Sequence, residues 1–122
     1  MERAVDPSGI TVVRGRSVRL DVFAAAGDAK NVKLKDVVTG ADRSPMSAGF
    51  MAWLREDSFA WTLDYYEFER GLEGTLEITV DGRSVRAHEG DVVFIPKGSK
   101  IVFGTPSSVR VFYVTHPASW AK

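Results

Sequence analysis

Residues 90–101 read Gly90-Asp-Val-Val-Phe-Ile-Pro96-Lys-Gly98-Ser-Lys-Ile101. The apolar run at 92–95 is short and rich in β-branched residues, which is typical of a strand. Pro96 and Gly98 end it in a turn, because proline lacks an amide hydrogen and glycine tolerates left-handed backbone. A second apolar run begins at Ile101, so the segment predicts two short strands joined by a tight turn.

The segments upstream and downstream show the same alternation of apolar and polar residues. Residues 75–80 place leucine, isoleucine and valine on one face, which is the period of a half-buried strand. Asp81-Gly82 is a strong hairpin signal, so we expect a returning strand with Val85 and Ala87 facing inward. Other strands are expected at 47–54, 59–63, 83–87, 101–103 and 109–115, with edge strands at 10–13, 18–23 and 32–34, and residues 24–28 fit either a loop or a short helical turn.

Many short strands separated by glycine or proline turns indicate an antiparallel sandwich or a closed barrel. A chain of 122 residues is large enough for one core and too small for two. We therefore predict an all-β fold, a jelly-roll β-barrel in one domain over residues 1–122, with the barrel core at about residues 47–116.

The composition restricts the classes of partner. Lysine plus arginine number 16 and aspartate plus glutamate number 16, so the net charge is zero. Nucleic acids and anionic membranes attract clustered cations, and we expect neither as a partner. No cysteine is present, which excludes disulfides and thiolate metal sites. There is no apolar run of about 18 residues and no secretory leader pattern, so we expect a cytoplasmic protein.

Two segments together resemble the motifs of the cupin superfamily. The family's first motif is His-x-His, three or four residues, Glu, and a strand that ends in Leu-Glu-Gly. Its second motif is Gly, five residues, Pro-x-Gly, two residues and His. This sequence matches at Glu67, Leu72-Glu73-Gly74, Gly90, Pro96 and Gly98.

The histidines that bind metal in that superfamily are replaced here. The first two fall on Trp61 and Leu63, or on Ala60 and Thr62 with the longer spacing, and the third falls on Ile101. A single carboxylate does not hold iron, manganese or zinc in a histidine-rich site. We therefore expect none of the usual cupin histidine ligands.

A narrower resemblance covers most of the chain and points to the cupin domain of the ethanolamine utilization protein EutQ family. It implies a homodimer, a role in ethanolamine catabolism in a bacterial microcompartment, and an ATP-linked acetate kinase activity. The family's usual N-terminal extension is not in this sequence, which argues against association with the microcompartment without excluding it, and we expect the cytoplasm. The matching blocks are residues 5–9, 32–38, 47–51, 61–63, 72–74, 94–99 and 103–106.

The strand that carries Glu67 is expected to aim Glu69 into the same interior, while Phe68 and Arg70 point away. Two buried carboxyls need compensation. They could hold Mg²⁺ together with Asp64, since magnesium prefers oxygen ligands. They could share a proton and act as acid and base, or they could bond nearby tyrosines and serve structure alone.

Glu67 and Glu69 are our candidate catalytic residues. Aromatic and soft apolar residues are expected to form the barrel lining, as core residues first and ligand walls second. Lys97, in the turn, could reach an anionic ligand, although a solvated lysine is the simpler interpretation. The candidate ligand-binding residues are Asp64, Tyr65, Tyr66, Trp53, Trp61, Met51, Lys97 and Tyr113.

Two functions follow from these residues and from the resemblance. The first is a barrel that binds a small molecule without a histidine-bound metal, linked to ethanolamine utilization. The alternative is an acetate kinase-like enzyme that uses Mg²⁺, ATP and the barrel carboxylates. The sequence contains no P-loop, the common glycine-rich cradle for phosphates, which favours binding. A metal-dependent cupin oxygenase or isomerase is a third interpretation.

Overall fold

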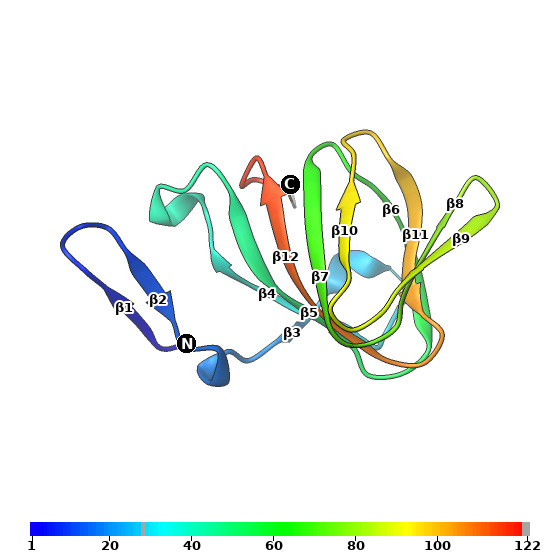
Figure 1. Cartoon of the computed structure of the whole chain (residues 1–122), viewed down its shortest axis with the longest axis horizontal. Helices are drawn as coiled ribbons and strands as arrows, with labels where there is room; N and C mark the ends of the chain where they lie inside the picture. Colours follow the sequence, from blue (N-terminus) through cyan, green and yellow to red (C-terminus); the bar gives the residue numbers. More distant parts are fainter. Residues whose placement is uncertain (28, 121–122) are drawn as a thin grey trace.

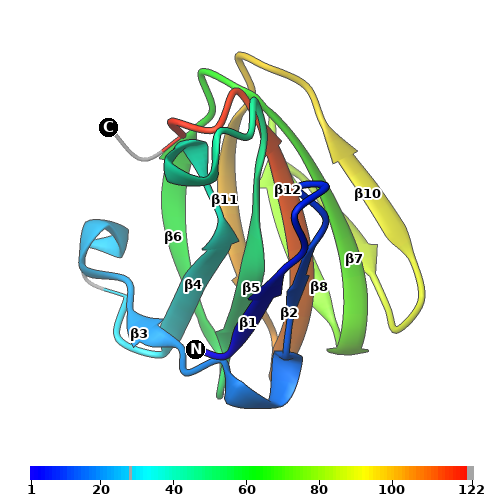
Figure 2. The same ribbon diagram turned by 90° about the vertical axis from the view of Figure 1, so that its left-hand side faces the viewer.

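The computed structural model describes residues 1–27 and 29–120 and consists of β-strands with short 3-10 turns (Figures 1 and 2). Two antiparallel sheets face each other, one with six strands in the order β10-β7-β12-β5-β4-β3 and one with four in the order β6-β11-β8-β9. The strands of the large sheet are β3 (Asp21–Val22), β4 (Val32–Val38), β5 (Ser47–Trp53), β7 (Tyr66–Gly74), β10 (Val92–Ile95) and β12 (Val109–His116). Those of the small sheet are β6 (Asp57–Thr62), β8 (Leu76–Val80), β9 (Arg83–Ala87) and β11 (Lys100–Thr105). This architecture confirms the predicted all-β fold.

The turn at 96–99 joins the two sheets, because β10 belongs to the large sheet and β11 to the small one. Its backbone is fixed by the Gly98 amide, which donates to the Leu63 carbonyl at 2.6 Å. Gly98 has a φ of 92°, a left-handed conformation that suits glycine. The turn predicted from Pro96 and Gly98 is therefore confirmed, and it connects one side of the sandwich to the other.

The N-terminal third differs from the prediction. Residues 11–13 do not form an edge strand of the barrel; they pair as β2 (Thr11–Val13) with β1 (Arg3–Val5) in a separate hairpin (Figure 1). The strand expected at 18–23 shrinks to β3. The strand expected at 32–34 extends to Val38 and lies inside the large sheet, because β3 pairs with its outer edge. The 3-10 turns are η1 (Gly15–Ser17), η2 (Ala24–Ala26) and η3 (Gly40–Asp42).

The core fills the space between the two sheets. Trp53 of the large sheet stacks on Phe59 of the small sheet with ring centroids 5.8 Å apart, and Leu76 and Ile78 are buried as predicted. Val85 is different: it is 50% exposed although it faces the same way as Ala87. Val85 lies on β9, the edge strand of the small sheet, in a hairpin that extends beyond the large sheet in Figure 1. The predicted inward position of Val85 is therefore wrong.

Within residues 1–27 and 29–120, no helix has the length and apolar character needed to cross a membrane.

Candidate functional site

Strand β7 carries two glutamates into the interior. The residues of this strand alternate between exposed and buried, so Glu67 and Glu69 are 5% and 1% exposed while Phe68 faces outward. The pattern follows from the two-residue period of a strand. The predicted inward orientation of both glutamates is confirmed, and their catalytic role stays a prediction.

Burial makes ionisation of this pair unfavourable. Loss of solvent raises the pKa of Glu67 and of Glu69, and the neighbouring Glu67 charge raises the pKa of Glu69 further. The Asp36 charge acts in the same direction on Glu67. Among the described residues, no donor bonds Oε1 or Oε2 of Glu69, and a hydrogen bond between the two carboxyls forms when one of them is protonated. The pair therefore favours a bound proton or an added positive charge.

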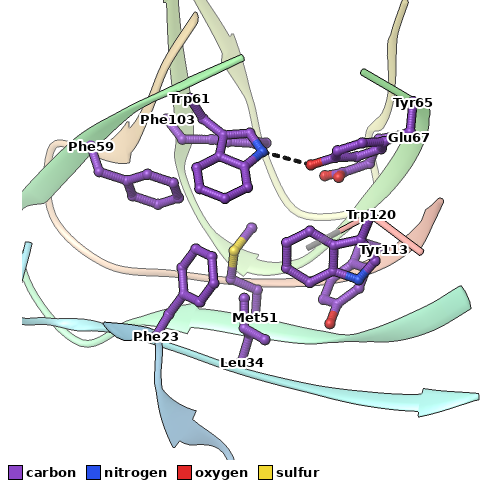
Figure 3. Close-up of a pocket in the computed structure, with 10 residues that line it drawn as sticks. All are labelled: Phe23, Leu34, Met51, Phe59, Trp61, Tyr65, Glu67, Phe103, Tyr113 and Trp120. Carbon is purple, nitrogen blue, oxygen red and sulfur yellow. Dashed lines mark hydrogen bonds between the residues drawn. The ribbon is translucent and has the colours of Figure 1, made fainter. Parts of the chain in front are cut away.

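Glu67 borders a cavity between the two sheets (Figure 3). The cavity holds about 20 Å³ for a water-sized molecule, within about 280 Å³ of empty space that includes its open mouth. A volume of about 10–15 Å³ accommodates one water, so the inner part takes one small group. Its other walls are apolar or aromatic: Phe23, Leu34, Met51, Phe59, Trp61, Tyr65, Phe103, Tyr113 and Trp120.

Hydrogen bonds hold the aromatic walls in place. Trp61 Nε1 donates to the Tyr65 hydroxyl at 2.7 Å, which is the dashed line in Figure 3. On another wall, the Tyr113 hydroxyl donates to Asp36 Oδ1 at 2.5 Å. Trp120 Nε1 donates to the same carboxylate, at 3.1 Å to Oδ1 and 3.2 Å to Oδ2. These bonds fix the orientation of each ring around the cavity.

Both tyrosines of the lining are held in the neutral form. Burial, followed by the Glu67 charge, raises the pKa of Tyr65. Burial and the bond to Asp36 raise the pKa of Tyr113. The two hydroxyls therefore keep their hydrogens, and Tyr65 and Tyr113 serve as walls and donors, not as bases.

Asp36 and Trp120 are important residues that the sequence did not reveal as part of the site. Asp36 continues the alternation of Val32 and Leu34 along β4, and this pattern was a usable signal once the strand was extended. Trp120 follows β12 and packs on Tyr65 and Tyr113, with ring centroids 6.0 Å away in both cases. A lone tryptophan near the end of the sequence gives no local hint of this position.

Several predicted ligand-binding residues lie elsewhere. Tyr66 is 47% exposed on the outer face of β7 and stacks on Phe94, because Glu67 takes the inward position. Asp64 and Lys97 are exposed in turns and do not line the cavity. Trp53 is 1% exposed, but it is a core residue outside the cavity lining. Met51, Trp61, Tyr65 and Tyr113 do line it, as expected.

The residues do not fit a metal centre. Across the part of the chain that the structure describes, no group of three or more His, Cys, Asp or Glu side chains is placed to hold a metal ion. Asp64 does not join Glu67 and Glu69, so the predicted three-carboxylate magnesium site is not formed. Leu63 and Ile101, at two positions where the superfamily has histidine, are buried core residues.

This chain is similar to a known protein family over its whole length. The family model for "Ethanolamine utilisation protein EutQ" matches residues 1–122. A relative from Escherichia coli strain K12, named acetate kinase EutQ, is 49% identical over 112 residues, which are 92% of this chain and 47% of the relative. The chain thus spans about half the length of this relative and of its Salmonella typhimurium counterpart.

Solved structures show the same fold. The crystal structure of ethanolamine utilization protein Q from Salmonella typhimurium LT2 matches with a TM-score of 0.92 and 45% identity, over 97% of this chain and 94% of that one. The cupin domain of Cnp3 from Schizosaccharomyces pombe, 17% identical, matches with a TM-score of 0.70 over 88% and 75% of the two chains. This chain has the cupin fold and belongs to the EutQ family of ethanolamine utilisation proteins.

Proposed function

We propose that this protein binds a small molecule in the cavity beside Glu67, without a histidine-bound metal, as part of ethanolamine utilisation. The observation that carries the proposal is a carboxyl, 5% exposed, at the edge of an otherwise apolar and aromatic cavity. A few polar groups in an apolar concave site are typical of small-molecule sites. Membership of the EutQ family supports the metabolic context.

The buried pair gives this site a chemical capacity beyond binding. Two interacting carboxyls with raised pKa values can share one proton, so one serves as an acid and the other as a base near neutral pH. Glu67 is the member that borders the cavity, whereas Glu69 lies behind the lining. In a reaction, Glu67 would therefore exchange the proton with the bound molecule, and Glu69 would act through Glu67.

An acetate kinase activity is the second candidate, supported by the name of the relative that is 49% identical. The cavity does not fit the cofactors of that reaction. No lysine, arginine or histidine belongs to its described lining, and the described residues contain no group suited to hold Mg²⁺. Phosphoryl transfer depends on cations around the phosphates, so no step through Mg²⁺ and ATP follows from this cavity.

One assay separates the two candidates. The protein is incubated with ATP, Mg²⁺ and acetate, and ADP and acetyl phosphate are measured for wild type, Glu67→Gln and Glu73→Gln. Glu73→Gln is the matched control because it lies on the same strand and its side chain is exposed. The binding function predicts no acetyl phosphate from any of the three proteins. Product that disappears only in Glu67→Gln would instead place kinase chemistry in the cavity.

We further propose that the protein is a cytoplasmic homodimer with no nucleic-acid or membrane partner. The dimer is supported by the apolar outer face of β7 and β10, where Phe68 and Phe94 are 52% and 51% exposed. Zero net charge supports the lack of nucleic-acid binding.

A further inference from the structure

The hydrogen-bond donors around the cavity are largely used by the protein itself. Trp61 Nε1 is bonded to Tyr65, and the Tyr113 hydroxyl and Trp120 Nε1 are bonded to Asp36. In Figure 3 the Tyr113 oxygen and the Trp120 nitrogen lie on the side of their rings away from Glu67. Among the described lining residues, the Tyr65 hydroxyl is the donor left without an acceptor. A bound molecule therefore meets more acceptors than donors.

The acceptors at this site are the carboxyl groups of Glu67 and Glu69, whose negative charge would be unbalanced if they ionised. No donor among the described residues bonds either oxygen of Glu69, whose carboxyl interacts with that of Glu67, and the Glu67 carboxyl borders the cavity. No cationic side chain lines the cavity within the described part of the chain. A buried carboxylate is stable only when it is paired or hydrogen-bonded, so a ligand with a positive charge and several donors would complete the pair.

The aromatic walls favour the same kind of ligand. Trp61, Trp120 and Tyr65 line the cavity, with Trp61 and Trp120 centroids 6.2 Å apart. The faces of tryptophan and tyrosine attract cations, and most strongly when the cation is desolvated. An anion such as acetate or a phosphate would meet these negative ring faces and the carboxyl pair together, and would be repelled by both.

The size of the cavity restricts the ligand to a small headgroup. Its inner part offers about 20 Å³ to a water-sized molecule, and an ammonium group is close to water in size. The empty space of about 280 Å³ includes the open mouth, so a short alkyl chain attached to the ammonium group would lie among the apolar and aromatic lining.

We propose that this cavity recognises a small primary alkylammonium ion, with its ammonium group against Glu67 and its alkyl part against Trp61 and Trp120. This inference rests on the proposed function that the cavity binds a small molecule, and it names the class of that molecule. No covalent step is part of the proposal.

Three probes of nearly equal size test it: ethylammonium, ethanol and acetate, with charges of plus one, zero and minus one. Each is titrated as its chloride or sodium salt, or neat for ethanol, at constant ionic strength and pH 8. Binding is followed by the fluorescence of the tryptophans and by the rise in Tm, which reports ligand that binds only the folded state. We expect ethylammonium to bind at least tenfold more tightly than ethanol, and acetate to bind least.

Glu67→Gln is expected to weaken ethylammonium binding at least tenfold, because the amide keeps the shape and loses the charge. Glu73→Gln, an exposed change on the same strand, is expected to leave binding unchanged. The unliganded Tm of each variant shows whether it is folded. The comparison of the three probes on wild-type protein stays decisive even if Glu67→Gln does not fold.

Three outcomes would contradict the ammonium proposal, and one of them would also contradict the proposed binding function. If ethanol or acetate binds as tightly as ethylammonium and Glu67→Gln abolishes that binding, the ammonium class is wrong and the proposed binding cavity stands. If ethylammonium binds equally to wild type and Glu67→Gln, its site lies elsewhere and both proposals fail. If none of the probes binds, the ammonium proposal is overturned.

Discussion

Glu69 is a carboxyl side chain with 1% exposure, and no donor among the described residues bonds its oxygens. Its pKa is raised by burial first and by Glu67 second. The folded protein therefore binds this proton more tightly than the unfolded chain does, and stability depends on pH. The contribution is fully present below the unfolded pKa, near 4.5, and is lost as pH rises through the higher folded value.

Glu69→Gln should remove this dependence, because glutamine does not ionise. We expect the stability of the variant relative to wild type to increase from pH 5 to pH 8, by about 1.4 kcal/mol for each unit by which the folded pKa of Glu69 exceeds its unfolded value. Urea unfolding at the two pH values measures it. Glu73→Gln, whose carboxyl is exposed, should show no such change between the two pH values. An equal effect of Glu69→Gln at pH 5 and pH 8 would contradict a raised pKa.

At the scale of elements, β5 lies between β12 and β4, and a side chain of β12 reaches across β5 to bond a side chain of β4. Gly49 of β5 is the direct neighbour of Tyr113 on one side and of Asp36 on the other. Without a side chain at this position, the Tyr113 ring lies over β5 and its hydroxyl reaches Asp36. A Cβ at Gly49 would meet the Tyr113 hydroxyl and the Lys35 carbonyl.

Gly49→Ala should therefore destabilise the fold by about 1–3 kcal/mol through overpacking, as measured by urea unfolding. Gly15→Ala is the control: it has open space around the new Cβ, and exposed substitutions of this kind stay within about 0.5 kcal/mol. The cost of Gly49→Ala should be smaller in a Tyr113→Leu background, which removes both the hydroxyl and the ring carbon Cζ that the new Cβ would meet. If the two changes are simply additive, the clash is not the cause.

At the scale of the whole molecule, the outer side of the large sheet carries an apolar cluster. Phe68 and Phe94 are in contact with centroids 5.0 Å apart, Tyr66 stacks on Phe94 at 6.2 Å, and Val92 is 67% exposed beside them. Contiguous exposed apolar patches mark interaction surfaces. This face, on one side of the barrel in Figure 1, is our proposed dimer contact.

Phe94→Glu should shift the protein toward a monomer, because a charge would be buried without a partner at the contact. We expect the dimer dissociation constant to rise at least tenfold in sedimentation experiments. Val85→Glu makes the same kind of change at a residue of similar exposure, 50% against 51%, on the β8–β9 hairpin of the other sheet. It should leave the association unchanged. A wild-type protein that sediments as a monomer would overturn the proposed dimer.

The sequence alone predicted most strands and turns after residue 47 and the inward direction of Glu67 and Glu69, because these depend on the two-residue period and on local backbone preferences. The family motifs also showed which residues of this chain stand where the superfamily has histidine, since the spacing within a motif is local.

Only the tertiary structure decided which side chains share the cavity. Asp36 meets Tyr113 and Trp120 across separations of 77 and 84 residues, while Tyr66, one residue from Glu67, faces the other side of the sheet. Val85 is 50% exposed although its pattern is that of a core residue, and it lies on β9, the edge strand of the small sheet. The physical reason is the strand order β10-β7-β12-β5-β4-β3, which brings distant segments together and which no local pattern encodes.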